Sequence, residues 1–109
     1  MLTLKIISYI VSAKGIRKMN AQKLAEASKM LKAIANEKRL TILYHISQRE
    51  LNVGEIESLV GLSQSALSQH LAVLRADNIV KTRRVAQTIY YSLKNKQIKE
   101  LLHMLSVLF

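Results

Sequence analysis

The chain has 109 residues, a length that suits a single domain. It has no cysteine, which excludes disulfides, thiolate metal sites and thiol redox switches. Seventeen lysine and arginine residues against seven acids give a formal net charge of +10, which favours a polyanionic partner such as nucleic acid or an anionic membrane. Only 5% of the residues are aromatic, so the core must be built mainly from Leu, Ile, Val and Ala, as in helical domains.

The first 18 residues differ from the rest of the chain. They hold an apolar run, LTLKIISYIV, which is too short to span a bilayer and is interrupted by Lys5, since a span takes ~20 apolar residues. No convincing signal-peptide cleavage site follows it. Residues 1–18 are expected to be an N-terminal extension, either an addition ahead of a natural start at Met19 or a short helix that packs on a partner chain. Residues 19–109 are expected to form the functional domain.

Two helices are predicted next, over residues 21–34 and 37–47, because apolar residues recur there at helical spacing. Helical spacing joins Leu24, Ala27, Leu31 and Ile34 in the first helix, and the second is expected to be a buried-type helix that holds Leu40, Leu43 and Ile46. Asn36 is a typical N-cap residue, and Glu37 suits the first turn of the second helix. A break is expected over residues 48–52.

Residues 53–75 predict two helices joined by a tight turn. The first covers residues 53–60, with Ile56, Leu59 and Val60 expected to face inward. Gly61 suits the left-handed conformation that ends a helix, and Ser63 is a good N-cap for the helix that follows. This arrangement is a helix-turn-helix, with its second helix presented outward.

The second of these helices has an unusual polar side. In the stretch GLSQSALSQHLAVLR, three leucines form one apolar stripe, but the opposite side holds short, uncharged residues instead of Lys and Glu. Short hydroxyls and amides can satisfy base-edge donors and acceptors in the DNA major groove. The base-reading candidates are Gln64, Ser65, Ser68 and Gln69. The alternatives are that Ser65 and Ser68 touch phosphates, or that this is an ordinary polar helix face.

Residues 80–84 and 88–93 are rich in β-branched and aromatic residues and predict a hairpin with a basic tip. Its candidate DNA contacts are Lys81, Arg83, Arg84 and Gln87. Adjacent strand residues point to opposite faces, so one of the two arginines is expected to grip DNA while the other pairs locally. The alternative is a solvated loop. A last helix over residues 95–108 completes a mainly α fold with a small β-hairpin, the winged helix.

The same stretches carry a family resemblance, which runs from about Leu24 to Leu105. LKAIANEKRLTIL, ELNVGEI, GLSQSALSQHLAVLR and VKTRRVAQTIYYSL are similar to motifs of the ArsR/SmtB family of winged-helix repressors, closest to its NolR-, HlyU- and BigR-like branch. The resemblance implies a cytoplasmic homodimer built mainly from the first and last helices of this domain. It also implies that the homodimer binds a palindromic operator in double-stranded DNA, usually as a repressor. The DNA-binding positions of the family fall on the same residues of the helix and the hairpin that are named above. The expected dimer interface residues are Leu24, Leu31, Leu101 and Leu105.

The chain departs from the sensing members of that family. Metal sensors carry two cysteines where this chain has Asn52 and Gly54, and sulfur sensors carry one where it has Tyr44. In the last helix only His103 with Glu100 is available, and this pair is expected to be a surface or interface feature. No metal, no cofactor, no membrane partner and no enzymatic activity are expected. A second hypothesis is a winged-helix module that binds protein, or an anti-repressor that competes with another DNA-binding protein.

Overall fold

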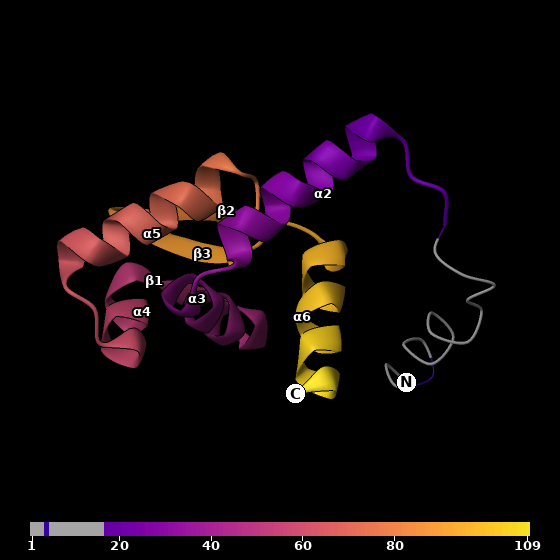
Figure 1. The fold of residues 1–109 in the computed structure, drawn as a ribbon. Helices are drawn as coiled ribbons and strands as arrows, with labels where there is room; N and C mark the ends of the chain where they lie inside the picture. The colour runs from indigo at the N-terminus through magenta and orange to yellow at the C-terminus, as the bar shows by residue number, and fades with distance from the viewer. Residues whose placement is uncertain (1–3, 5–16) are drawn as a thin grey trace.

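The computed structural model describes residue 4 and residues 17–109, so the expectation for residues 1–18 lies almost wholly outside the described residues. The elements follow in the order α2 (Ala21–Ile34), α3 (Glu37–Gln48), β1 (Leu51–Asn52), α4 (Val53–Val60), α5 (Gln64–Ala76), β2 (Val80–Val85), β3 (Thr88–Leu93) and α6 (Lys96–Leu108). Figure 1 shows the helices gathered around a small sheet. The predicted winged helix-turn-helix is confirmed.

Each helix from α2 to α6 begins at a side-chain N-cap. Asn20, Asn36, Asn52, Ser63 and Asn95 each accept a hydrogen bond from the backbone N–H three residues further on. Gly61 ends α4 with φ of 67°, a left-handed conformation that glycine adopts without steric cost. These local signals place the break between α4 and α5, and they confirm the predicted roles of Asn36, Gly61 and Ser63.

The sheet has one strand more than the sequence predicted. β1 pairs with β3, with Leu51 opposite Tyr91 and Asn52 opposite Tyr90, so the strand order is β1-β3-β2. A strand of two residues shows no periodicity, which is why the segment was expected to be an irregular break. β1 joins the hairpin to the α3–α4 connection. The hairpin therefore forms part of a three-stranded sheet, which is more stable than an isolated hairpin.

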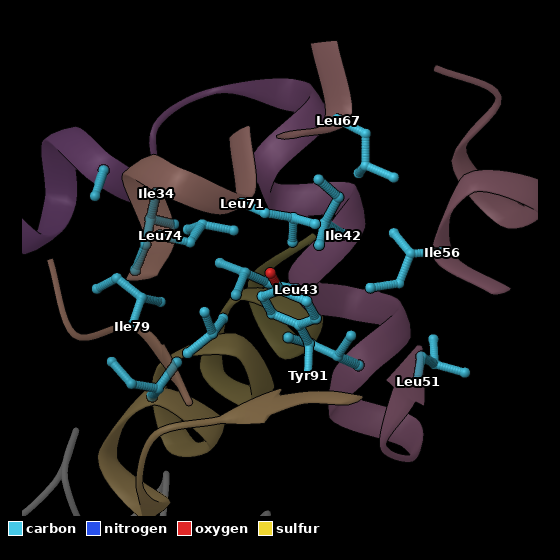
Figure 2. Packing of buried hydrophobic residues seen from close by; sticks show 14 residues of the cluster. Ile34, Ile42, Leu43, Leu51, Ile56, Leu67, Leu71, Leu74, Ile79 and Tyr91 are labelled. Atoms are coloured by element: carbon cyan, nitrogen blue, oxygen red, sulfur yellow. The ribbon is translucent and has the colours of Figure 1, made fainter. Parts of the chain in front are cut away.

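The core lies between α3, α5 and the inner face of the sheet (Figure 2). α3 contributes Ile42, Leu43 and Ile46, and Tyr91 of β3 packs beside Leu43. The three leucines of α5 complete this centre: Leu67, Leu71 and Leu74 are all buried, as their spacing predicted. Because this stripe is fixed in the core, the opposite side of α5 must face outward.

Two expected core positions were wrong. Leu59 is 50% exposed, because Val53, Ile56 and Val60 share the inward face of α4 at spacings of three and four residues. Leu40 is 36% exposed, because the inward face of α3 passes through residues 42, 43 and 46 instead. Both leucines lie beside the inward stripe of their helix, where spacing alone does not distinguish a core position from a border one.

The start of α4 gives a prediction about acid stability. The Glu55 carboxylate accepts the backbone N–H of Asn52 at 3.0 Å and two hydrogen bonds from Arg49 at 3.2 Å. These bonds, that from Asn52 first, lower the pKa of Glu55 below its ordinary 4.5. The ionised Glu55 carboxylate therefore stabilises the fold at pH values above its ordinary pKa of 4.5. This contribution is lost as the pH falls through the lowered pKa that Glu55 has in the folded chain.

We expect Glu55→Gln to be less stable than the parent chain at about pH 7 and to approach it at about pH 3, because glutamine keeps the capping bond but lacks the charge. Urea denaturation at both pH values measures the difference. Glu57→Gln removes a carboxylate from the same helix without touching the cap, so it serves as the control. A Glu55→Gln deficit that stayed constant with pH would contradict the assignment.

Candidate nucleic-acid interface

The polar side of α5 is open to solvent. All four base-reading candidates are exposed: Gln64, Ser65, Ser68 and Gln69. Ser63, the N-cap, lies beside Ser65 with 3.4 Å between the two hydroxyl oxygens. The chain therefore presents short amides and hydroxyls along the first two turns of a helix whose other side is fixed in the core. That arrangement suits the floor of a major groove.

His70 lies at the border of this face and is half-buried. Its Nδ1 atom lies 3.4 Å from Nη1 of Arg39, and because a guanidinium only donates, Nδ1 is the acceptor. Arg39 also donates to the backbone carbonyls of Ala33 and Lys32 at the end of α2. Arg39 was not among the predicted site residues, since nothing in its local sequence indicates a contact with a residue 31 positions away. This arginine links the end of α2 and the start of α3 to the middle of α5.

The hairpin presents its cations as the strand alternation predicted. Arg83 is paired with Tyr90 and Arg84 with Ile89 in neighbouring rungs of the sheet, so the two arginines project to opposite faces. Lys81 and Gln87 are exposed, Gln87 within the two-residue turn that joins the strands. Ala86 opens that turn with a positive φ of 55°. The hairpin therefore places cationic side chains on both faces of its sheet.

Arg83 is the arginine that pairs locally, and its partner is Glu50. Arg83 donates from Nη2 to a Glu50 carboxylate oxygen at 2.6 Å and from Nε at 3.2 Å. This bonding lowers the pKa of the Glu50 carboxyl and raises the pKa of the Arg83 guanidinium. Sequence reasoning missed Glu50 because it precedes β1, the strand that was not predicted.

The predicted interface leucines divide into two groups. Leu24 and Leu31 of α2 are 54% and 52% exposed, while Leu101 and Leu105 of α6 are half-buried. Figure 1 shows the amino-terminal part of α2 projecting from the body of the domain, on the same side as α6. Exposed leucines on a projecting helix leave an apolar surface that a second chain could cover.

An open groove of about 700 Å³ lies between α3 and α6. Its apolar lining includes Leu40, Tyr44, Leu102, Leu105 and Phe109. Leu105, one of the expected interface residues, thus lies in a groove and not on a flat helix face. Leu40, which was expected in the core, forms part of the opposite wall.

Two further observations concern partners. Within residue 4 and residues 17–109, no group of three or more His, Asp or Glu side chains is arranged to hold a metal ion. In the same part of the chain, no helix is both long enough and apolar enough to cross a membrane.

The fold and the exposed α5 face beside a basic hairpin define a winged helix-turn-helix protein that binds nucleic acid. The profile of the bacterial regulatory protein, arsR family, matches residues 36–82. The transcriptional activator HlyU of Vibrio cholerae is 48% identical over 95 residues, covering 84% of this chain and 88% of the relative. The chain therefore belongs to the arsR family and is a DNA-binding regulator of transcription.

Two other relatives and the solved structures agree with this assignment. The nodulation protein NolR of Rhizobium meliloti is 52% identical over 83 residues, 76% of this chain and 68% of the relative. The solved structure of HlyU from Vibrio cholerae has a TM-score of 0.78 at 48% identity, covering 84% of this chain and 98% of that one. The transcriptional repressor BigR of Xylella fastidiosa has a TM-score of 0.76 at 34% identity, covering 81% and 90%. The expected branch of the family is confirmed.

Proposed function

We propose that the chain is a cytoplasmic, homodimeric regulator that binds a palindromic operator and represses transcription by occupying it. The observation that carries this proposal is the uncharged polar face of α5, which is exposed to solvent in a fold that also carries the basic hairpin. A face meant for a protein partner would be expected to offer aromatic or other hot-spot anchors, and this face has none. The proposal includes no enzymatic role.

The DNA contacts are assigned by chemistry. Gln64, Ser65, Ser68 and Gln69 would read base edges, because glutamine pairs well with adenine and serine with several bases. Lys81, Arg84 and Gln87 would hold the sugar-phosphate backbone, which fixes register without specifying sequence. Arg83 was a candidate for the same role, but its guanidinium is bonded to Glu50, so we place it in support of the hairpin.

The dimer would form through the leucines of α2 and α6. Leu24 and Leu31 of α2 expose apolar surface that costs free energy in water, and Leu101 and Leu105 are half-buried on α6. Two copies related by a two-fold axis would present two α5 helices to successive major grooves, about 34 Å apart. A palindromic operator matches that symmetry.

The test compares Gln69→Ala with Arg84→Ala. We expect Gln69→Ala to lower affinity for an operator, obtained by enrichment from a random duplex pool, by ~5- to 100-fold and to leave random DNA almost unaffected. Arg84→Ala should weaken binding to all duplexes and reduce the salt slope by ~0.9. Anisotropy titrations at several salt concentrations measure both. Equal losses on operator and random DNA for both variants would contradict this division of roles.

The sign of regulation needs its own measurement, since BigR is named a repressor and HlyU an activator. A reporter gene placed behind the enriched operator should fall in expression when the chain is produced. The Gln69→Ala variant, produced at the same level, should restore expression. A reporter that rose with the wild-type chain and not with this variant would identify an activator.

A further inference from the structure

Glu50 reaches across the sheet to the far strand. It directly precedes β1, and its partner Arg83 lies on β2, with β3 between the two strands. Tyr90 of β3 is opposite Asn52 on one side and Arg83 on the other. The carboxylate and the guanidinium, 33 residues apart in sequence, thus meet over the middle strand. Three hydrogen bonds join them, at 2.6, 3.2 and 3.2 Å.

The Tyr90 ring makes a second contact with Arg83, whose side chain is otherwise exposed. The guanidinium carbon lies 4.8 Å from the ring centroid, within the range of a cation–π contact. Arg83 is therefore held by a carboxylate and by the ring of Tyr90. Arg83 gives its Nε and Nη2 donors, one edge of the guanidinium fork, to the Glu50 carboxylate, so that edge cannot also bind a phosphate bidentately, and the carboxylate offsets its charge.

Arg84 provides the internal comparison. It donates from Nε to the carbonyl of Ala86 at 3.0 Å, and within residues 17–109 no acid forms an ion pair with it. The two arginines are adjacent in sequence and equal in charge. They differ in that only Arg83 faces Glu50. Arg83 is therefore engaged by a carboxylate of the same chain, whereas the charge of Arg84 remains available for a phosphate.

We propose that Glu50 is a specificity-determining positioning residue, which holds Arg83 away from the DNA backbone and ties the hairpin to the start of α4. The proposal rests on the proposed function. Pairing Arg83 removes one cation from the sequence-independent attraction to phosphate, which lowers binding to random DNA. The same bond fixes the hairpin relative to the helix-turn-helix, so that the base-reading helix and the backbone-holding strands meet one duplex in register.

The test is Glu50→Gln in the full chain, titrated with the enriched operator and with a random duplex of equal length. Freed from its carboxylate, Arg83 should gain a phosphate contact. We expect tighter binding to random DNA, a salt slope steeper by ~0.9, and a ratio of operator to random affinity lower by ~3- to 10-fold. Glu57→Gln is the matched control, because it makes the same change in net charge at a position on α4.

A second variant separates positioning from direct contact. Arg83→Ala should leave the salt slope on random DNA close to that of the wild type, whereas Arg84→Ala should reduce it by ~0.9. Circular dichroism confirms that each variant is folded. Two results would overturn the Glu50 proposal alone. One is an equal effect of Glu50→Gln and Glu57→Gln on DNA binding, and the other is a salt slope that Arg83→Ala reduces by as much as Arg84→Ala does. A wild-type chain that bound no duplex would instead refute the proposed function, and this proposal with it.

Discussion

Replacing Leu31 with glutamate should convert the proposed dimer into a monomer and lower the affinity of the chain for a palindromic operator by roughly 100-fold or more. Leu31 is 52% exposed in the single chain, so the substitution removes little packing from the fold itself. In a dimer seam, however, the carboxylate would be buried without a partner, which is strongly unfavourable. The monomer would hold only one half-site and would lose the high effective concentration that linkage gives the second half.

Light scattering at micromolar concentration measures the oligomeric state, and anisotropy on the enriched operator measures the binding. Gln97→Glu adds the same charge at an exposed position of α6 and should leave both quantities nearly unchanged. Binding of the Leu31→Glu chain to random DNA should fall much less than binding to the operator. A Leu31→Glu chain that remained dimeric would show that the seam lies elsewhere.

The elements that the sequence predicted well are those with local causes. α5 follows from three leucines at helical spacing, from a glycine that ends α4 and from a serine that caps the next helix. The split of Arg83 and Arg84 between two faces follows from the two-residue period of a strand. In each case the determining residues lie within a few positions of one another, so a single sequence contains the necessary information.

The features that escaped prediction depend on pairing at a distance. β1 is defined only by its partner β3, about 40 residues later, because two residues have no period of their own. Glu50 and Arg39 are ordinary surface residues in sequence, and their roles appear only when the fold brings Arg83 and His70 beside them. The exposed residues of the candidate site on α5 and the hairpin could thus be predicted from the sequence. The contacts that hold these two elements in place could not.

These distant contacts share one property, which is that each connects the DNA-facing elements to another part of the fold. Glu50 ties the hairpin to the α3–α4 connection, and Arg39 ties α5 to the end of α2. Lys29 of α2 also pairs with Asp77 at the end of α5, at 3.5 Å. Since α2 carries the exposed leucines of the proposed seam, the two latter contacts connect the helix of the seam directly to α5.

Stability and recognition should be separable within α5, because its two sides have different surroundings. Leu67→Ala should lower the free energy of unfolding by about 2–5 kcal/mol, since Leu67 is 0% exposed and its loss leaves a cavity. That is a large share of the ~5–15 kcal/mol that stabilises a typical domain. Ser68→Ala, one residue further on and exposed, should change stability by less than ~0.5 kcal/mol.

Binding should respond in the opposite way. Ser68→Ala should weaken operator affinity by about fivefold, the value of one hydrogen bond of ~1 kcal/mol, while Leu67→Ala should bind normally under conditions where it stays folded. Urea denaturation followed by circular dichroism measures the first effect, at equal chain concentration because the proposed dimerisation would stabilise the fold. Anisotropy measures the second. If Ser68→Ala unfolded as readily as Leu67→Ala, the polar side of α5 would be part of the folded core, and it could not be the surface that meets the bases.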